Sequence, residues 1–124
     1  MEGAPDKRDM ARVSDACRVA YRSIDGSSPA ERKIAARTLN LSASGVCLVA
    51  EDALQPDRHV ALEMILSDRD APVVAVGRVV WCDRDGDQFR IGVCFTWLRE
   101  EDRKDLGIIG DYVARMLARD QSGD

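Results

Sequence analysis

The chain has 124 residues, a length that suits one domain with a substantial core. Its net charge of −4 argues against a general nucleic-acid or membrane-surface binder, because such affinity comes largely from accumulated positive charge. No apolar run approaches the roughly 20 residues that span a bilayer, and the opening residues do not read as a signal peptide, so we expect a cytoplasmic protein without membrane insertion.

Motifs for catalysis or metal binding are missing from the sequence. The four cysteines have no C-x-x-C spacing, so we expect reduced thiols and no metal or cofactor. The single histidine, His59, has no nucleophile placed near it by a recognisable motif. The sequence also lacks the two glycine-rich motifs that usually bind nucleotide phosphates, G-x-x-x-x-G-K-[ST] and G-x-G-x-x-G. The segment Asp83–Asp87 lacks calcium-loop spacing and is better read as a hairpin turn. We therefore expect a protein that is not an enzyme.

The predicted elements begin with an arm over residues 1–14, which are charged and lack periodicity. A strand starts near residue 16, with Cys17, Val19 and Tyr21 on one face, and a turn-rich loop follows at 25–31. Alternation or β-branched runs predict the remaining strands, at 33–42, 45–50, 60–66, 72–82 and 89–95. Six short strands with turns between them indicate a sandwich or a barrel, and a barrel would leave no open edges.

The C-terminal segment is helical instead. Apolar residues from Leu98 to Leu117 mostly follow helical spacing, and acidic residues at 100–102 suit the first turn of a helix. Gly107 and Gly110 each weaken a helix by about 1 kcal/mol, and close packing on the β-domain is the expected compensation. The expected organisation is thus an arm at 1–14, a β-domain with its helix at 15–119, and a tail at 120–124.

The candidate binding site lies where one predicted strand ends. Strand alternation places Asn40 and Ser42 on the same face, and Gly45 then forms a turn where backbone can approach closely. Arg8 and Arg12 lie four residues apart on the arm. An amide, a hydroxyl and two guanidinium groups suit a ligand that carries phosphates and purine edges.

These two elements, in this order and followed by a terminal helix, resemble the PilZ family of bacterial cyclic di-GMP receptors. The resemblance runs from about Lys7 to Val113. It is supported by the segments Gly77-Arg78-Val79-Val80-Trp81 and Ile91-Gly92-Val93-Cys94-Phe95, and by the acidic entry to the last helix.

The resemblance implies a mainly β fold, a six-stranded antiparallel β-barrel with a C-terminal α-helix, which binds cyclic di-GMP on its outer surface. The family's first motif, matched by Arg8 and Arg12, clasps phosphates and guanines. Its second motif, matched by Asn40, Ser42 and Gly45, contacts a guanine edge and shapes the turn.

Four residues need separate comment, and two of the questions they raise have alternative answers. Lys7 stands where the family often has another arginine, so it keeps the charge but loses the planar fork. Trp81 either flanks the ligand, as at this position in some relatives, or simply packs on the barrel. Arg18 and Arg22 form a second R-x-x-x-R pair, which is more simply read as exposed charges on the first strand.

The sequence thus predicts a cyclic di-GMP sensor of bacterial second-messenger signalling, acting in processes such as motility and biofilm formation. Ligand binding would order the arm, and a downstream protein partner would read that change. The alternative is a PilZ-like protein-interaction module without nucleotide, acting in pilus or motility machinery. Binding of single-stranded nucleic acid is less favoured, because the chain has few aromatic residues and a negative net charge.

Overall fold

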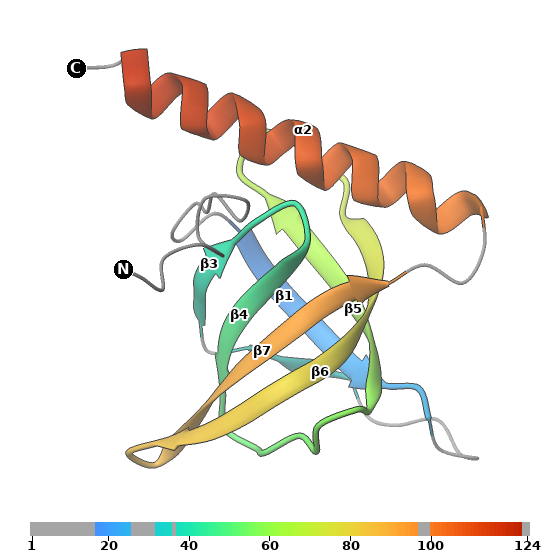
Figure 1. Cartoon of the computed structure of the whole chain (residues 1–124), viewed down its shortest axis with the longest axis vertical. Coiled ribbons are helices and arrows are strands. Elements are labelled where there is room, and N and C mark those ends of the chain that lie inside the picture. Colours follow the sequence, from blue (N-terminus) through green and yellow to red (C-terminus); the bar gives the residue numbers. More distant parts are fainter. Residues whose placement is uncertain (1–16, 26–31, 36, 97–99, 123–124) are drawn as a thin grey trace, which may run out of the picture.

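The computed structural model describes residues 17–25, 32–35, 37–96 and 100–122. The predicted arm, with Lys7, Arg8 and Arg12, lies outside the described residues. Within the described part, one antiparallel sheet carries a single long helix, α2 (Glu100–Ser122), which lies across the upper end of the sheet in Figure 1.

Seven strands make up the sheet, in the order β2-β1-β5-β6-β7-β4-β3. Their bounds are β1 Cys17–Ser23, β2 Lys33–Ile34, β3 Arg37–Leu41, β4 Gly45–Ala50, β5 His59–Leu66, β6 Val73–Asp85 and β7 Gln88–Thr96. All neighbouring strands run antiparallel, so most strands can pair through short hairpin connections.

The prediction of a closed six-stranded barrel is wrong in one respect, because the sheet is a seven-stranded half-barrel. The predicted strand 33–42 divides into β2, which pairs with β1, and β3, which pairs with β4. The hydrogen-bonded ladder therefore ends at β2 on one side and at β3 on the other. Only three residue steps separate Ile34 from Arg37, a reach of about 11 Å, so the two edges still lie close together.

The core lies inside the curve of the sheet, under α2. Cys17, Val19 and Tyr21 are all buried, as their alternation predicts. The helix adds its own apolar face to this core through Ile109, Tyr112 and Val113. Burying that face is what holds a surface helix against a sheet, since helix propensity alone contributes little.

Helix α2 departs from prediction at one glycine. The helix runs from Glu100 to Ser122. Gly107 does not pack closely, because a side-chain carbon there would meet nothing within 4 Å, whereas one at Gly110 would lie 3.8 Å from Ala43. None of the helices in the described residues is long and apolar enough to cross a membrane.

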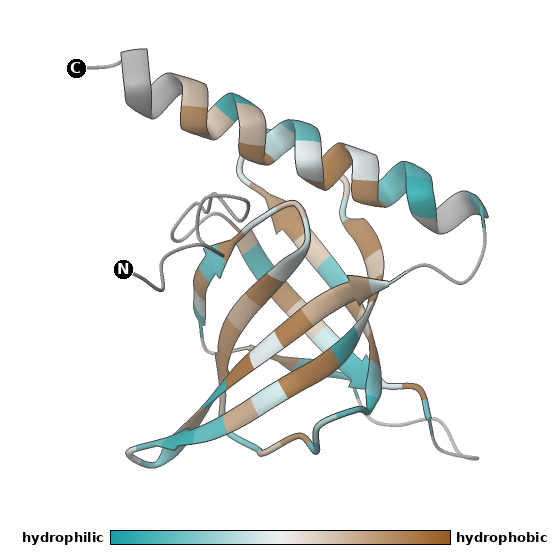
Figure 2. Ribbon diagram, in the orientation of Figure 1, coloured by the Kyte–Doolittle hydropathy of each residue, from teal (hydrophilic) through white to brown (hydrophobic). Residues whose placement is uncertain are grey.

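The β6–β7 hairpin is longer than predicted. Asp85 pairs with Gln88, so the connecting turn is only Gly86 and Asp87, and Gly86 has a φ of +68° that suits glycine. Figure 2 shows that this far end of the hairpin is hydrophilic. The segment read as a turn at 83–87 is thus mostly strand.

Candidate ligand-binding site

A hollow of about 280 Å³ lies on the outer face of β3, β4, β7 and β6. Its lining includes four residues predicted for the site, namely Asn40, Ser42, Gly45 and Trp81. Asn40 and Trp81 are 41 positions apart in the chain. Their meeting is a consequence of strand pairing and is not visible in local sequence.

One row of paired residues forms the centre of the hollow. Asn40 pairs with Cys47, Cys47 with Gly92, and Gly92 with Trp81, across four neighbouring strands. The register shifts at both ends of this row, between Thr38 and Asn40 and between Val79 and Trp81. An extra residue at such a β-bulge changes which face the following side chains occupy.

The bulge in β6 decides where Trp81 points. Regular alternation would place Trp81 on the same face as Val79, which is fully buried in the core. Instead the indole is 37% exposed and rests on Gly92, where an added side-chain carbon would overlap the indole Cε2 and Nε1 atoms. Trp81 therefore packs on the outside of the half-barrel, at the edge of the hollow.

The turn between β3 and β4 is held by Ser42. The Ser42 backbone N–H donates to the Gly45 carbonyl oxygen at 2.9 Å, and the Ser42 Oγ accepts the N–H groups of Ser44 and Gly45 at 3.2 Å each. The Ser42 side chain is only 5% exposed. Because its oxygen is engaged within the turn, the geometry suits a turn-shaping role better than direct contact with a ligand.

Asn40 and Gly45 have different local roles. A side-chain carbon at Gly45 would overlap the carbonyl oxygen of Val93, so glycine is what allows β4 and β7 to approach here. Asn40 lines the hollow, and its side-chain amide makes no hydrogen bond within the described residues. The amide offers both a donor and an acceptor to a ligand.

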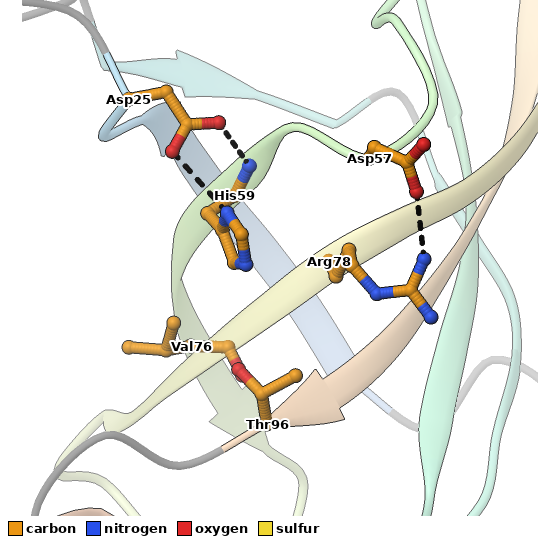
Figure 3. Close-up of polar contacts among 6 residues, drawn as sticks. All are labelled: Asp25, Asp57, His59, Val76, Arg78 and Thr96. Atoms are coloured by element: carbon orange, nitrogen blue, oxygen red, sulfur yellow. Dashed lines mark hydrogen bonds and ion pairs between the residues drawn. The ribbon is translucent and has the colours of Figure 1, made fainter.

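Arginines flank the hollow on both sides. On one side, Arg78 pairs with Cys94 across the sheet, and its Nη1 donates to Asp57 Oδ1 at 2.9 Å (Figure 3). On the other side, Arg90 of β7 pairs with Val49 of β4 and with Asp83 of β6. These exposed ion pairs and charges contribute little to stability, so the arginines can be recruited by an anion.

Sequence reasoning missed these flanking arginines. Arg78 lies within a segment already linked to the family, but its side-chain position depends on the register of β6 against β7. A hairpin register centred on the Gly86–Asp87 turn would have placed Arg90 opposite Asp83, and so on the outer face.

His59 is held at the beginning of β5 by Asp25. The Asp25 Oδ2 accepts the His59 backbone N–H at 2.7 Å, and Oδ1 lies 3.2 Å from the ring Nδ1 (Figure 3). Hydrogen bonding to the His59 backbone lowers the pKa of Asp25. This is a structural link between two chain segments, and within the described residues no group of side chains could hold a metal ion.

The alternative pair Arg18 and Arg22 is not brought to the hollow. Both lie on β1, where Arg18 lines a second pocket and Arg22 a third. The outer hollow is suited to ligand binding, because it combines a polar amide, a rigid turn and an exposed indole beside arginines.

A mainly β half-barrel with a C-terminal helix and a hollow on its outer face defines a small binding module. A family model described as the PilZ domain matches residues 6–113. The chain belongs to the PilZ domain family, a family of regulatory binding modules that includes cyclic di-GMP receptors. None of the curated proteins gives a significant match.

Solved structures share this fold at low sequence identity. The PilZ domain of YcgR with c-di-GMP, from Escherichia coli, has a TM-score of 0.60 at 17% identity, with 95% of this chain and 98% of that chain covered. The Bacillus subtilis inhibitor of motility MotI/DgrA has a TM-score of 0.69 at 14% identity, with 90% of this chain covered. The match spans only 52% of that protein. The PilZ domain of CeSA from a cellulose-synthesizing bacterium has a TM-score of 0.54 at 18% identity, covering 77% and 89% of the two chains.

Proposed function

We propose that this PilZ domain is a cyclic di-GMP receptor that binds its ligand at the outer hollow. The observation that carries the proposal is the joint lining of that hollow by Asn40, Gly45 and Trp81. A volume of about 280 Å³ lies just below the range of roughly 300–1,000 Å³ that is usual for small-molecule pockets. One guanine would therefore occupy the hollow, with the rest of the ligand over the flanking arginines.

The chemistry of the lining matches a guanine. The Asn40 amide can donate to the O6 or N7 atom of guanine or accept from its N–H groups. The exposed indole of Trp81 offers an apolar surface on which a purine can stack. Ser42 acts indirectly, by fixing the turn that carries Gly45 and the neighbouring backbone groups.

The phosphates require cations, for which we propose Arg8 and Arg12, with Lys7 as a weaker third group. Their guanidinium groups can bind phosphate oxygens in pairs and stack on purines. Ordering this segment on binding costs about 1–2 kcal/mol per fixed residue, so the affinity depends on many contacts forming together.

Signal output would follow from the same ordering event. A segment folded over the hollow changes the shape and charge of the surface that a protein partner meets. The turn at the hollow also approaches α2, because Ala43 lies beside Gly110. That MotI is an inhibitor of motility supports a partner in motility machinery.

The direct test is calorimetric titration of the full chain with cyclic di-GMP, with cyclic di-AMP and GMP as controls. We expect saturable heat with cyclic di-GMP alone, and weaker binding by Asn40→Ala and by Arg12→Ala. Arg18→Ala should bind like the unchanged protein. No heat at high micromolar ligand refutes the proposal, and loss of binding only with Arg18→Ala or Arg22→Ala would instead assign the first motif to that pair.

A further inference from the structure

A second and larger pocket, of about 590 Å³, lies at the open seam of the half-barrel. It shares no lining residue with the outer hollow. Its buried floor consists of Cys17, Val19, Ala35 and Thr38, and the more exposed Ile34 and Ile65 form its sides. This size is well within the range of small-molecule sites.

The pocket exists because the ladder does not close. The two-residue strand β2 covers only Ala20 and Tyr21 of β1, and the Ala35 backbone N–H then donates to the Val19 carbonyl oxygen at 3.0 Å. Beyond that hydrogen bond, no strand in the described residues pairs with β1 on this side.

Thr38 gives the floor an unsatisfied polar group. Its side chain is 3% exposed, and its Oγ1 atom has no hydrogen-bond partner in the described structure. Thr38 pairs with the fully buried Leu48 of β4, so its side chain faces the core, and the bulge that follows turns Asn40 to the outer face. A buried hydroxyl without a partner costs free energy, and a polar ligand atom would recover it.

The neighbouring thiol does not satisfy that hydroxyl. Burial raises the pKa of Cys17 to about 11, and an interaction with the Thr38 side chain lowers it in part. A thiol is only a weak hydrogen-bond donor and acceptor, so this contact does not replace a strong partner for the Thr38 hydroxyl. The thiol therefore stays neutral and forms an apolar part of the floor.

The rim is positively charged although the chain as a whole is acidic. Arg18, Arg32 and Arg37 line the pocket together with a single acidic residue, Glu63. The Nε atom of Arg32 lies 2.7 Å from Glu63 Oε1, which neutralises that pair. Neither Arg18 nor Arg37 forms an ion pair within the described residues, so two guanidinium groups remain for an anion.

We propose that the seam pocket binds a small amphipathic acid that has an apolar ring and a second polar group at its far end. The acid group lies between Arg18 and Arg37, and the ring covers Val19, Ala35 and the isoleucine sides. The far polar group exchanges a hydrogen bond with Thr38 Oγ1. This site is independent of the outer hollow and of the function proposed there.

The test is a nuclear magnetic resonance titration of the full, ¹⁵N-labelled chain with three matched probes. These are 3-(4-hydroxyphenyl)propionate, the same acid without its hydroxyl group, and tyramine, which keeps the hydroxyphenyl ring but carries a cation. We expect saturable shifts of the Val19, Ala35 and Thr38 amides with the hydroxy acid. Binding should be about tenfold weaker without the hydroxyl group and lost with tyramine.

Two variants separate the contributions. Thr38→Val, which keeps the shape of the side chain, should remove the difference between the two acids. Arg18→Ala combined with Arg37→Ala should weaken both acids at least tenfold, whereas Arg22→Ala, on the same strand but outside this pocket, should not. Shifts that do not saturate, shifts centred on Asn40 to Gly45, or equal binding of tyramine would each overturn the proposal. A repeat with cyclic di-GMP present keeps this result separate from the function of the outer hollow.

Discussion

The contact between Trp81 and Gly92 offers the most direct test of the outer hollow. In Gly92→Ala the new carbon would overlap the indole Cε2 and Nε1 atoms and lie 2.8 Å from Cζ2. Alanine is acceptable in a strand, and Gly92 faces outward between Cys47 and Trp81. The indole must therefore leave its position, while the sheet behind it stays intact.

The size of the effect follows from stacking. An aromatic side chain stacked on a base contributes about 1–3 kcal/mol, so Trp81→Ala should weaken cyclic di-GMP binding roughly 5- to 150-fold. Gly92→Ala should lose most of the same binding free energy, because the new methyl group displaces the indole ring of Trp81. In a Trp81→Ala background, Gly92→Ala should then have almost no further effect, since the two changes act on one interaction.

Calorimetric titration of the wild type, both single variants and the double variant measures this coupling. Val74→Ala is the matched control, because Val74 is an exposed residue of β6 that does not line the hollow. Thermal melts of all five proteins check that the fold survives. This account of the site would be refuted if the two losses of binding free energy were additive in the double variant. It would also be refuted if Trp81→Ala bound cyclic di-GMP with wild-type affinity.

Three further predictions concern the turn, the helix and the core. Ser42→Ala should lower the free energy of unfolding, measured in urea, by about 1–3 kcal/mol, because two N–H groups of the turn lose their acceptor. Ser42→Thr keeps a hydroxyl group and should retain more of that stability. An unchanged free energy of unfolding in Ser42→Ala would contradict the structural role of Ser42. Gly107→Ala should raise the melting temperature, through about 0.5–1 kcal/mol of added stability, because the new methyl group meets open space; a decrease would contradict the helix geometry. Burial raises the pKa of Cys17 from 9.0 to about 11, so its contribution to stability is present below pH 9 and is lost as the pH rises toward 11. Native Cys17 should therefore resist iodoacetamide at about pH 9 and react once urea unfolds the chain, as mass spectrometry can show.

The local pattern of apolar residues was enough to predict most strands. The alternation of Cys17, Val19 and Tyr21 gives the buried face of β1, and the run 45–50 coincides with β4. These elements are predictable because side chains of a strand alternate with a period of two and one face must be buried. The division of 33–42 into two strands was missed, because no residue there marks a break as strongly as proline or two glycines would.

The role of each candidate residue was harder to predict from the sequence. The second motif implies both a guanine contact and a turn-shaping role, and the Ser42 oxygen accepts two N–H groups of its own turn. Trp81 had two open interpretations, flanking the ligand or packing on the barrel, and regular alternation from Val79 would have pointed it into the core. The bulge that turns it outward appears only when β6 is aligned with β7.

The amino-acid sequence by itself determined most of the strands, the terminal helix and the compact turn from Asn40 to Gly45, because these depend on neighbours along the chain. Tertiary structure alone decided that Trp81 and Asn40 line one hollow, that Thr38 Oγ1 is buried with no hydrogen-bond partner among the described residues, and that their sheet stays open at β2 and β3. Each of these depends on strand register, which is set by cross-strand packing between residues far apart in the chain.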